Sequence, residues 1–357
     1  MRTRRREKAR PKTPRPTCEY PHTMDYWAYG LSITSNVEIP AFGTFTSLGT
    51  FDISFQMGPP PSWADEASSD RGEVVYSPSL PARTDSKLTI TRLLSGKFLE
   101  LRYDDGTRFI MDGGAKSIWA EEGPGLSRDD VFTYLVGPIM GFVLRRREKL
   151  ALHASSVIVD DMAIAICGEA GSGKSTTAAA LALRGNQVLC EDICALQNLY
   201  GHKYVLPAYP RISLWPDSAS RLFSSADVLP LVAKGWDKRY LQLDGQRAGF
   251  SNSPAPLGAI YLLAARSDAR TAPSIERLSQ REAALALVQN TYMNYLLTKK
   301  QRAAEFYTIA SLVSEVDCYC ITPHADPARI RDLALLVEAH ATNFISGLKS
   351  SSAHLVP

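Results

Sequence analysis

The sequence lacks any run of apolar residues long enough to span a lipid bilayer. The longest such run, from Phe132 to Leu144, has thirteen residues, whereas a membrane-spanning helix needs about 20. The first sixteen residues contain no apolar stretch, which argues against a secretory signal. We therefore expect a cytoplasmic protein that has no membrane partner.

Cysteine pairs with metal-ligand spacing are also missing. None of the six cysteines forms a C-x-x-C pair, and four of them lie in apolar, strand-like runs. This usage predicts reduced core cysteines, and it argues against a zinc site or a disulfide framework.

Beyond its N-terminal end the chain has little excess charge. Residues 1–17 hold eight of the 40 Lys and Arg residues and one of the 37 Asp and Glu residues, so they carry a charge of +7 and the remainder carries −4. A body without a basic excess argues against nucleic acid as a partner. Residues 1–23 cannot bury apolar surface, and we predict a disordered basic tail there.

What the sequence does contain is a phosphate-loop signature. Residues Gly168–Ser175 match the pattern G-x-x-x-x-G-K-[ST] at every fixed position. The apolar run Met162–Cys167 before it predicts a buried strand, and the Ala- and Leu-rich run Thr176–Arg184 after it predicts a helix. Backbone N–H groups at such a junction bind phosphate oxygens, and the helix dipole favours negative charge there.

The chemistry of this loop assigns roles to its side chains. Lys174, which we expect to be exposed, would reach the β- and γ-phosphates of a nucleotide, and the Ser175 hydroxyl would bind Mg²⁺. We predict ATP and Mg²⁺ as cofactors, and GTP stays an alternative. The predicted nucleotide-binding residues are Gly168, Glu169, Ala170, Gly171, Ser172, Gly173, Lys174, Ser175, Thr176 and Arg211.

An acidic pair follows the next predicted strand. Gln187–Cys190 reads as a short strand that ends at Glu191 and Asp192. Strand ends in open α/β sheets face the ligand crevice, where one carboxylate can hold Mg²⁺ and another can accept the proton of an attacking hydroxyl. Two surface acids in a turn are the alternative interpretation. Downstream, Lys238 and Arg239 are further candidates for clamping phosphates or the base.

Residues 24–149 are predicted to form a β-rich region. Strand patterns cover residues 26–34, 51–55, 86–91, 98–103 and 107–110, and a polar run from 59 to about 71 predicts an exposed loop. Ser127 and Asp130 have the spacing of a capping box, which predicts a helix that runs to 145–147. No catalytic constellation is visible in this region.

From about His153 to Ala341 the chain resembles the catalytic domain of the HPr kinase/phosphorylase family. The closest resemblance is to HPr-kinase-like proteins of peptide-modification gene clusters, such as those for lasso peptides. It rests on His153, fifteen residues before Gly168, on the loop, and on the acidic pair sixteen and seventeen residues after Ser175. The first acid is Glu191, where the family carries an aspartate.

The resemblance implies an α/β fold with a P-loop, HPr-kinase-like catalytic domain related to phosphoenolpyruvate carboxykinase. We place that domain at residues 150–342, after a smaller β-rich domain at 24–149 and before a frayed C-terminus at 343–357. The resemblance also implies that the acceptor is a serine hydroxyl of a peptide or protein.

The combined prediction is an ATP-dependent kinase. Asp192 would be the general base, and Glu191 would assist it or hold the metal through water. Lys174 would neutralise developing charge, and His153 would orient the acid or the phosphate. The predicted metal ligands are Ser175, Glu191 and Asp192. A nucleotide-binding regulatory module without transfer activity and a small-molecule kinase or carboxykinase-type enzyme are the alternatives, and a homo-oligomer is compatible with the sequence.

Overall fold

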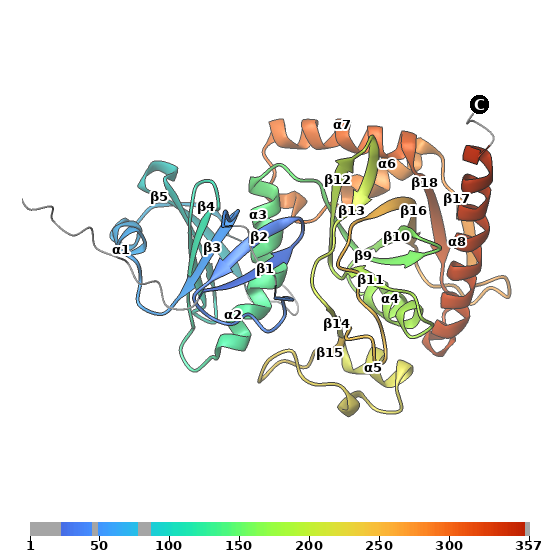
Figure 1. Cartoon of the computed structure of the whole chain (residues 1–357), viewed down its shortest axis with the longest axis horizontal. Coiled ribbons are helices and arrows are strands. Elements are labelled where there is room, and N and C mark those ends of the chain that lie inside the picture. The colour runs from blue at the N-terminus through green and yellow to red at the C-terminus, as the bar shows by residue number, and fades with distance from the viewer. Residues whose placement is uncertain (1–22, 45–48, 78–86, 354–357) are drawn as a thin grey trace, which may run out of the picture.

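The computed structural model describes residues 23–44, 49–77 and 87–353, and the predicted basic tail lies almost entirely outside these ranges. The described chain has a mixed α/β fold in which two large β-sheets lie side by side (Figure 1). No helix within these ranges has both the length and the apolar character needed to cross a membrane.

The first eight strands form one sheet in the order β1-β2-β3-β8-β7-β6-β5-β4. Neighbouring strands are antiparallel except for the pairs β2–β3 and β3–β8, which are parallel. The strands are β1 Met24–Ala28, β2 Leu31–Ser35, β3 Ile53–Met57, β4 Glu73–Tyr76, β5 Leu88–Leu93, β6 Phe98–Tyr103, β7 Arg108–Asp112 and β8 Ser117–Glu121.

Two predictions for this region are wrong. The single strand expected over 26–34 is a hairpin, because Tyr29 and Gly30 have φ angles of 56° and 70° and turn β1 back onto β2. The exposed loop expected from 59 to about 71 contains a short helix, α1 Ser62–Ser68, whose Ala64 and Ala67 are buried.

A helical segment joins the two sheets and stands between them in Figure 1. It consists of α2 Arg128–Tyr134, a π-helical turn η2 Leu135–Ile139 and α3 Met140–Arg146. The predicted capping box is confirmed, because the Asp130 carboxylate accepts hydrogen bonds from the Ser127 N–H at 2.9 Å and hydroxyl at 2.8 Å. Pro138 lies inside the π turn and has no N–H to donate, so the regular α-helical hydrogen bonding is interrupted there.

The second sheet follows the order β10-β9-β12-β13-β16-β18-β17, and β11 pairs with β9. Because β10 also pairs in parallel with β16, the strands from β10 to β16 close into a ring. Strands β14 and β15 form a separate antiparallel pair. The strands are β9 Ala151–Val159, β10 Met162–Gly168, β11 Val188–Cys190, β12 Ile193–Leu199, β13 His202–Val205, β14 Arg211–Leu214, β15 Arg239–Gln242, β16 Ala255–Leu263, β17 Ser274–Arg277 and β18 Asp317–Thr322.

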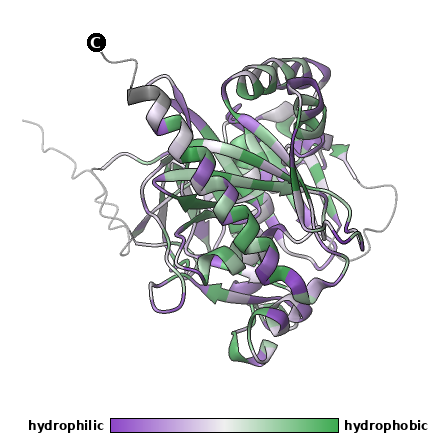
Figure 2. Cartoon of the chain, turned by 90° about the vertical axis from the view of Figure 1, so that its right-hand side faces the viewer, coloured by the Kyte–Doolittle hydropathy of each residue, from purple (hydrophilic) through white to green (hydrophobic). Residues whose placement is uncertain are grey.

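Helices cover this sheet on several sides, with α7 above it, α4 below it and α8 along its outer side in Figure 1. Figure 2 looks onto α8, which alternates hydrophilic and hydrophobic residues along its length. The helices are α4 Lys174–Ala182, α5 Pro216–Leu222, α6 Gln280–Gln289, α7 Lys299–Glu315 and α8 Ile330–Ala353.

The frayed C-terminus predicted over 343–357 is wrong as far as Ala353, and residues 354–357 lie outside the described ranges. Helix α8 continues to Ala353 because its apolar face still packs on the core at Ile345, which is fully buried. Lys349 extends the contact by donating to the backbone carbonyl of Asp160 at 2.9 Å.

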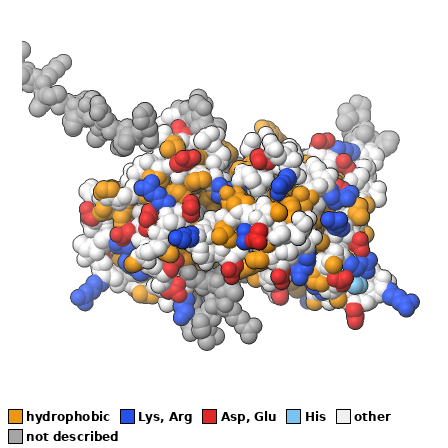
Figure 3. Space-filling view, turned by 90° about the horizontal axis from the view of Figure 1, so that it is seen from below, with side chains coloured by type: hydrophobic (Ala, Val, Ile, Leu, Met, Phe, Trp, Pro, Cys, Tyr) orange, Lys and Arg blue, Asp and Glu red, His pale blue; other side chains and the backbone are white. Residues whose placement is uncertain are grey.

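One hydrophobic cluster runs through both sheets, so that Ile33 and Phe55 of the first belong to the same core as Leu152 and Val205 of the second. The five described cysteines are free thiols. On the face shown in Figure 3, acidic and basic side chains are intermixed.

Candidate active site

The loop between β10 and α4 has the backbone geometry of an anion cradle. Gly168, Gly171 and Gly173 have φ angles of 148°, 80° and 107°, a region that side-chain-bearing residues rarely adopt. Within the described ranges, the N–H groups of Gly171 and Gly173 have no protein acceptor. A Cβ added at Gly171 would meet nothing within 4 Å, so the loop opens onto free space.

Lys174 is buried, contrary to the expectation of an exposed side chain. Its Nζ donates to the carbonyl oxygens of Gly168 at 2.8 Å and Glu169 at 3.0 Å, and the residue is only 6% exposed. Burial lowers the pKa of Lys174, against an opposing effect of the Asp192 charge. The Lys174 ammonium is thus held against the loop, where it can bind an anion that enters the loop.

Glu191 bonds to the first turn of α4. The Ser175 hydroxyl donates to Glu191 Oε1 at 2.7 Å. Burial and the neighbouring charge of Asp192 raise the pKa of Glu191 to about 7, although Lys238 and the Ser175 hydrogen bond act in the other direction. A hydroxyl and a carboxylate oxygen this close together are ligands of the type that Mg²⁺ prefers.

Both carboxylate oxygens of Asp192 are held, and its side chain is 37% exposed. His153 Nε2 lies 3.0 Å from Oδ1, and the Tyr292 hydroxyl donates to Oδ2 at 3.2 Å. Burial alone would raise the pKa of Asp192, but the hydrogen bond and charge of His153, together with Lys238 and Lys174, outweigh it and lower that pKa. Burial raises the pKa of Tyr292 well above its usual value, so its hydroxyl stays protonated.

Asn290 aligns the strand of His153 with the loop, and sequence reasoning missed it. Its backbone carbonyl accepts the His153 N–H at 2.7 Å, and its side-chain oxygen accepts the Gly168 N–H at 3.0 Å. Helix α6 ends at Gln289, which places Asn290 at its C-cap. No clear sequence signal pointed to this role, because asparagine marks a helix end in the left-handed conformation, whereas Asn290 has a φ of −99°.

Lys174, Glu191 and Asp192 line one cavity of about 1100 Å³. The residues of the predicted site that line this cavity are His153, Ala170, Gly171, Gly173, Lys174, Ser175, Thr176, Glu191, Asp192 and Arg211. Gly168, Glu169 and Ser172 are not among its lining residues, although the carbonyls of the first two hold Lys174. Part of the cavity wall comes from the N-terminal region, which sequence reasoning had left without a place in the site. Its residues include Leu88, Tyr103, Phe132 and Tyr134.

Of the three basic residues predicted to clamp phosphates or the base, two line the cavity and one does not. Arg211 lines the cavity, but its guanidinium donates to the Pro40 carbonyl at 2.8 Å and lies 4.3 Å from the Tyr240 ring. Lys238 also lines it, whereas Arg239 pairs with Asp227 at 2.6 Å and is not among the lining residues.

Arg266 is a further basic residue of the cavity wall that sequence reasoning missed. It follows β16, the parallel neighbour of β10, and its guanidinium would lie 3.4 Å from a Cβ added at Gly173.

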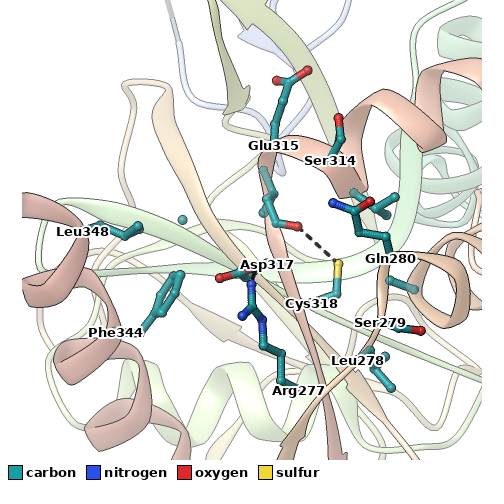
Figure 4. Close-up of a pocket in the computed structure, with 14 residues that line it drawn as sticks. Arg277, Leu278, Ser279, Gln280, Ser314, Glu315, Asp317, Cys318, Phe344 and Leu348 are labelled. Carbon is teal, nitrogen blue, oxygen red and sulfur yellow. Dashed lines mark hydrogen bonds and ion pairs between the residues drawn. The ribbon is translucent and has the colours of Figure 1, made fainter. Parts of the chain in front are cut away.

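A second hollow of about 540 Å³ lies between α6, α7 and α8 (Figure 4). Two of its charged groups, Arg277 and Asp317, form an ion pair with each other. The Cys318 thiol donates to the Val316 carbonyl at 3.6 Å. None of the loop or acidic-pair residues lines this hollow, so the larger cavity is the candidate active site.

No protein-family model matches the chain, and no curated protein matches it. Among solved structures, the chain is similar to the Hpr(Ser) kinase/phosphatase from Coxiella burnetii, with a TM-score of 0.33 and 18% sequence identity. The similarity covers 58% of this chain and 99% of that one. At this distance the likeness carries no functional argument, and function has to be argued from the site.

Proposed function

We propose that this protein is an ATP-dependent kinase that transfers the γ-phosphoryl group of Mg²⁺–ATP to a serine hydroxyl of a peptide or protein. One observation carries the proposal: Asp192, whose pKa is lowered, opens onto the same cavity as the glycine loop and Lys174. A proton acceptor and an anion cradle that face one space are the two parts that phosphoryl transfer requires.

The loop fits the phosphates of a nucleotide. The N–H groups of Gly171 and Gly173 and the Lys174 ammonium provide donors at the start of α4, where the helix dipole also favours an anion. Thr176 and Arg211 extend this wall.

The oxygens of Ser175 and Glu191 fit a magnesium ion. Nowhere in the described ranges do three or more His, Cys, Asp or Glu side chains gather as a metal site, so an ion here would complete its shell with phosphate oxygens and water. When bound, Mg²⁺ offsets the charge on the β- and γ-phosphate oxygens.

Asp192 then accepts the proton of the acceptor hydroxyl. The hydroxyl oxygen bonds to the γ-phosphorus, and the bond between the γ-phosphorus and the bridging oxygen breaks, so that ADP leaves. His153 holds one oxygen of this carboxylate, and Lys174 stabilises the charge on the transferring group. The cavity of about 1100 Å³ leaves room for part of an acceptor beside the nucleotide.

A Mg²⁺ titration of phosphate transfer tests these roles. The assay follows label from γ-labelled ATP into a library of serine-containing peptides, with a matched serine-to-alanine library as control. Asp192→Asn should lower transfer by about 10²- to 10⁴-fold at every Mg²⁺ concentration, the usual scale for a lost acid–base group. Glu191→Gln should raise the Mg²⁺ concentration that gives half-maximal rate.

Rescue of Asp192→Asn by Mg²⁺, with none for Glu191→Gln, would reverse the two assignments. A wild-type protein that binds an ATP analogue but labels neither peptides nor proteins would contradict the kinase proposal in favour of a regulatory nucleotide-binding module.

A further inference from the structure

Tyr292 contacts the proposed base but has no part in the mechanism above. Its hydroxyl donates to Asp192 Oδ2 at 3.2 Å across a separation of 100 residues in the chain. We propose that Tyr292 is a positioning residue, which fixes the orientation of the Asp192 carboxylate in the cavity. This inference rests on the proposed function.

The argument begins with the two anchors of the carboxylate. His153, on β9, holds Oδ1, and Tyr292, in the segment that follows α6, holds Oδ2. A carboxylate with one anchor can rotate about its Cβ–Cγ bond, whereas two anchors from different elements fix its plane. The direction in which Asp192 receives a proton is then set before a substrate arrives.

Tyr292 is itself held from several sides. Its N–H donates to the Ala151 carbonyl at 2.9 Å, and its carbonyl accepts a hydrogen bond from Arg145 Nε. Its ring meets the His153 ring edge-on, with centroids 5.9 Å apart and planes at 85°. The ring also fills the space that a side chain at Gly141 would need, because a Cβ there would lie 2.1 Å from Tyr292 Cε1.

The support continues behind Tyr292 through a buried ion pair. Arg145, on α3, is 6% exposed and pairs with Glu305 on α7. Burying a cation is costly unless it is paired and hydrogen-bonded, and this one gives a hydrogen bond to the backbone of Tyr292. Helices α3 and α7 are therefore both connected to the residue that holds Asp192.

Steady-state kinetics of Tyr292→Phe test the proposal, because this change removes the hydroxyl and keeps the ring. We expect kcat to fall by about 10- to 100-fold, the scale of a hydrogen bond to a charged group, while the Kd for a non-hydrolysable ATP analogue stays within about twofold. The matched control is Tyr307→Phe, since Tyr307 is 75% exposed on α7 and lies outside the cavity wall.

A double-mutant cycle separates positioning from a general structural role. If Tyr292 acts through Asp192, Tyr292→Phe should have little further effect on kcat in an Asp192→Asn background. Additive losses in the cycle, or an unchanged kcat in Tyr292→Phe, would overturn the proposal.

A crystal structure of Tyr292→Phe makes the inference testable apart from the kinase proposal. A rotated Asp192 carboxylate would support positioning even if the wild-type protein transferred no phosphate, in which case only the proposed function would fail. A carboxylate that keeps its place on His153 would overturn the positioning role.

Discussion

At the scale of single residues, two adjacent carboxylates of this chain have opposite surroundings. Glu191 is 7% exposed, and burial together with its neighbour raises its pKa to about 7. Asp192 faces the cavity, and His153 leads the groups whose lowering effect exceeds the penalty of burial. Groups with divergent pKa values divide acid, base and metal-binding roles between them. This contrast favours Asp192 as the proton acceptor.

The pKa of Glu191 predicts a pH dependence of stability. Its pKa of about 7 in the folded protein exceeds the ordinary value of 4.5, so between these pH values the folded state binds more protons than the unfolded chain. This contribution to the free energy of unfolding is therefore present below about pH 4.5 and is lost as the pH rises through about 7. Without Mg²⁺, the wild type should lose melting temperature relative to Glu191→Gln over that range. If the melting temperatures of the two proteins changed equally with pH over that range, the raised pKa of Glu191 would be contradicted.

The burial of Lys174 decides which substitution tests its role, because alanine would leave a hole beside the loop. Lys174→Met keeps most of the side-chain volume and removes the ammonium. Phosphate transfer should be lost and the Kd for an ATP analogue should rise. The carbonyls of Gly168 and Glu169 also lose their donor, so the free energy of unfolding should fall by about 1–3 kcal/mol. Urea denaturation and analogue binding provide the two measurements, and near-wild-type turnover by the folded variant would exclude this loop as the phosphate site.

At the scale of elements, the junction of α3 with Tyr292 gives a paired prediction. Gly141→Ala would place a Cβ 2.1 Å from the Tyr292 ring, and such overpacking should cost about 1–3 kcal/mol of stability. Gly137→Ala, in the preceding π turn, meets nothing within 4 Å and serves as the matched stability control, because alanine favours a helix over glycine by about 1 kcal/mol. Both are measured by urea denaturation. Equal free energies of unfolding for the two variants would show that the Tyr292 ring moves aside without cost.

Local sequence patterns predicted most elements around the loop but not their partners. The strand predicted over Met162–Cys167 is β10, and the helix predicted over Thr176–Arg184 is α4. The positions where strands end were harder to predict, because the turn at Tyr29 depends on a positive φ at a residue other than glycine. The contact of Tyr292 with Asp192 could not be predicted, since no local pattern encodes a hydrogen bond across 100 residues.

At the scale of the whole molecule, the two sheets are joined by a common hydrophobic core and by hydrogen bonds. Tyr29 and Phe42 lie in one buried cluster with Leu206 and Tyr209. The Tyr29 N–H donates to the Pro207 carbonyl at 2.8 Å, and Trp236 Nε1 donates to Asp130 Oδ1 at 2.8 Å. The cavity wall also draws on both regions. The predicted division into domains near residue 150 stays a prediction, but each part would expose its share of the common cluster without the other.

This shared core predicts that the full chain unfolds in one cooperative step. Calorimetry should give a ratio of calorimetric to van't Hoff enthalpy near about 1, and an ATP analogue should raise the single melting temperature. A fragment of residues 150–357 would expose Leu206 and Tyr209, which belong to the common cluster, so it should lack a cooperative transition and fail to bind the analogue. Two resolved transitions in the full chain, or a fragment that melts cooperatively and binds the analogue, would instead establish two independent folding units. The site would then form where finished domains dock, and mutations in the aromatic wall of the N-terminal region would change transfer while leaving nucleotide binding by the fragment intact.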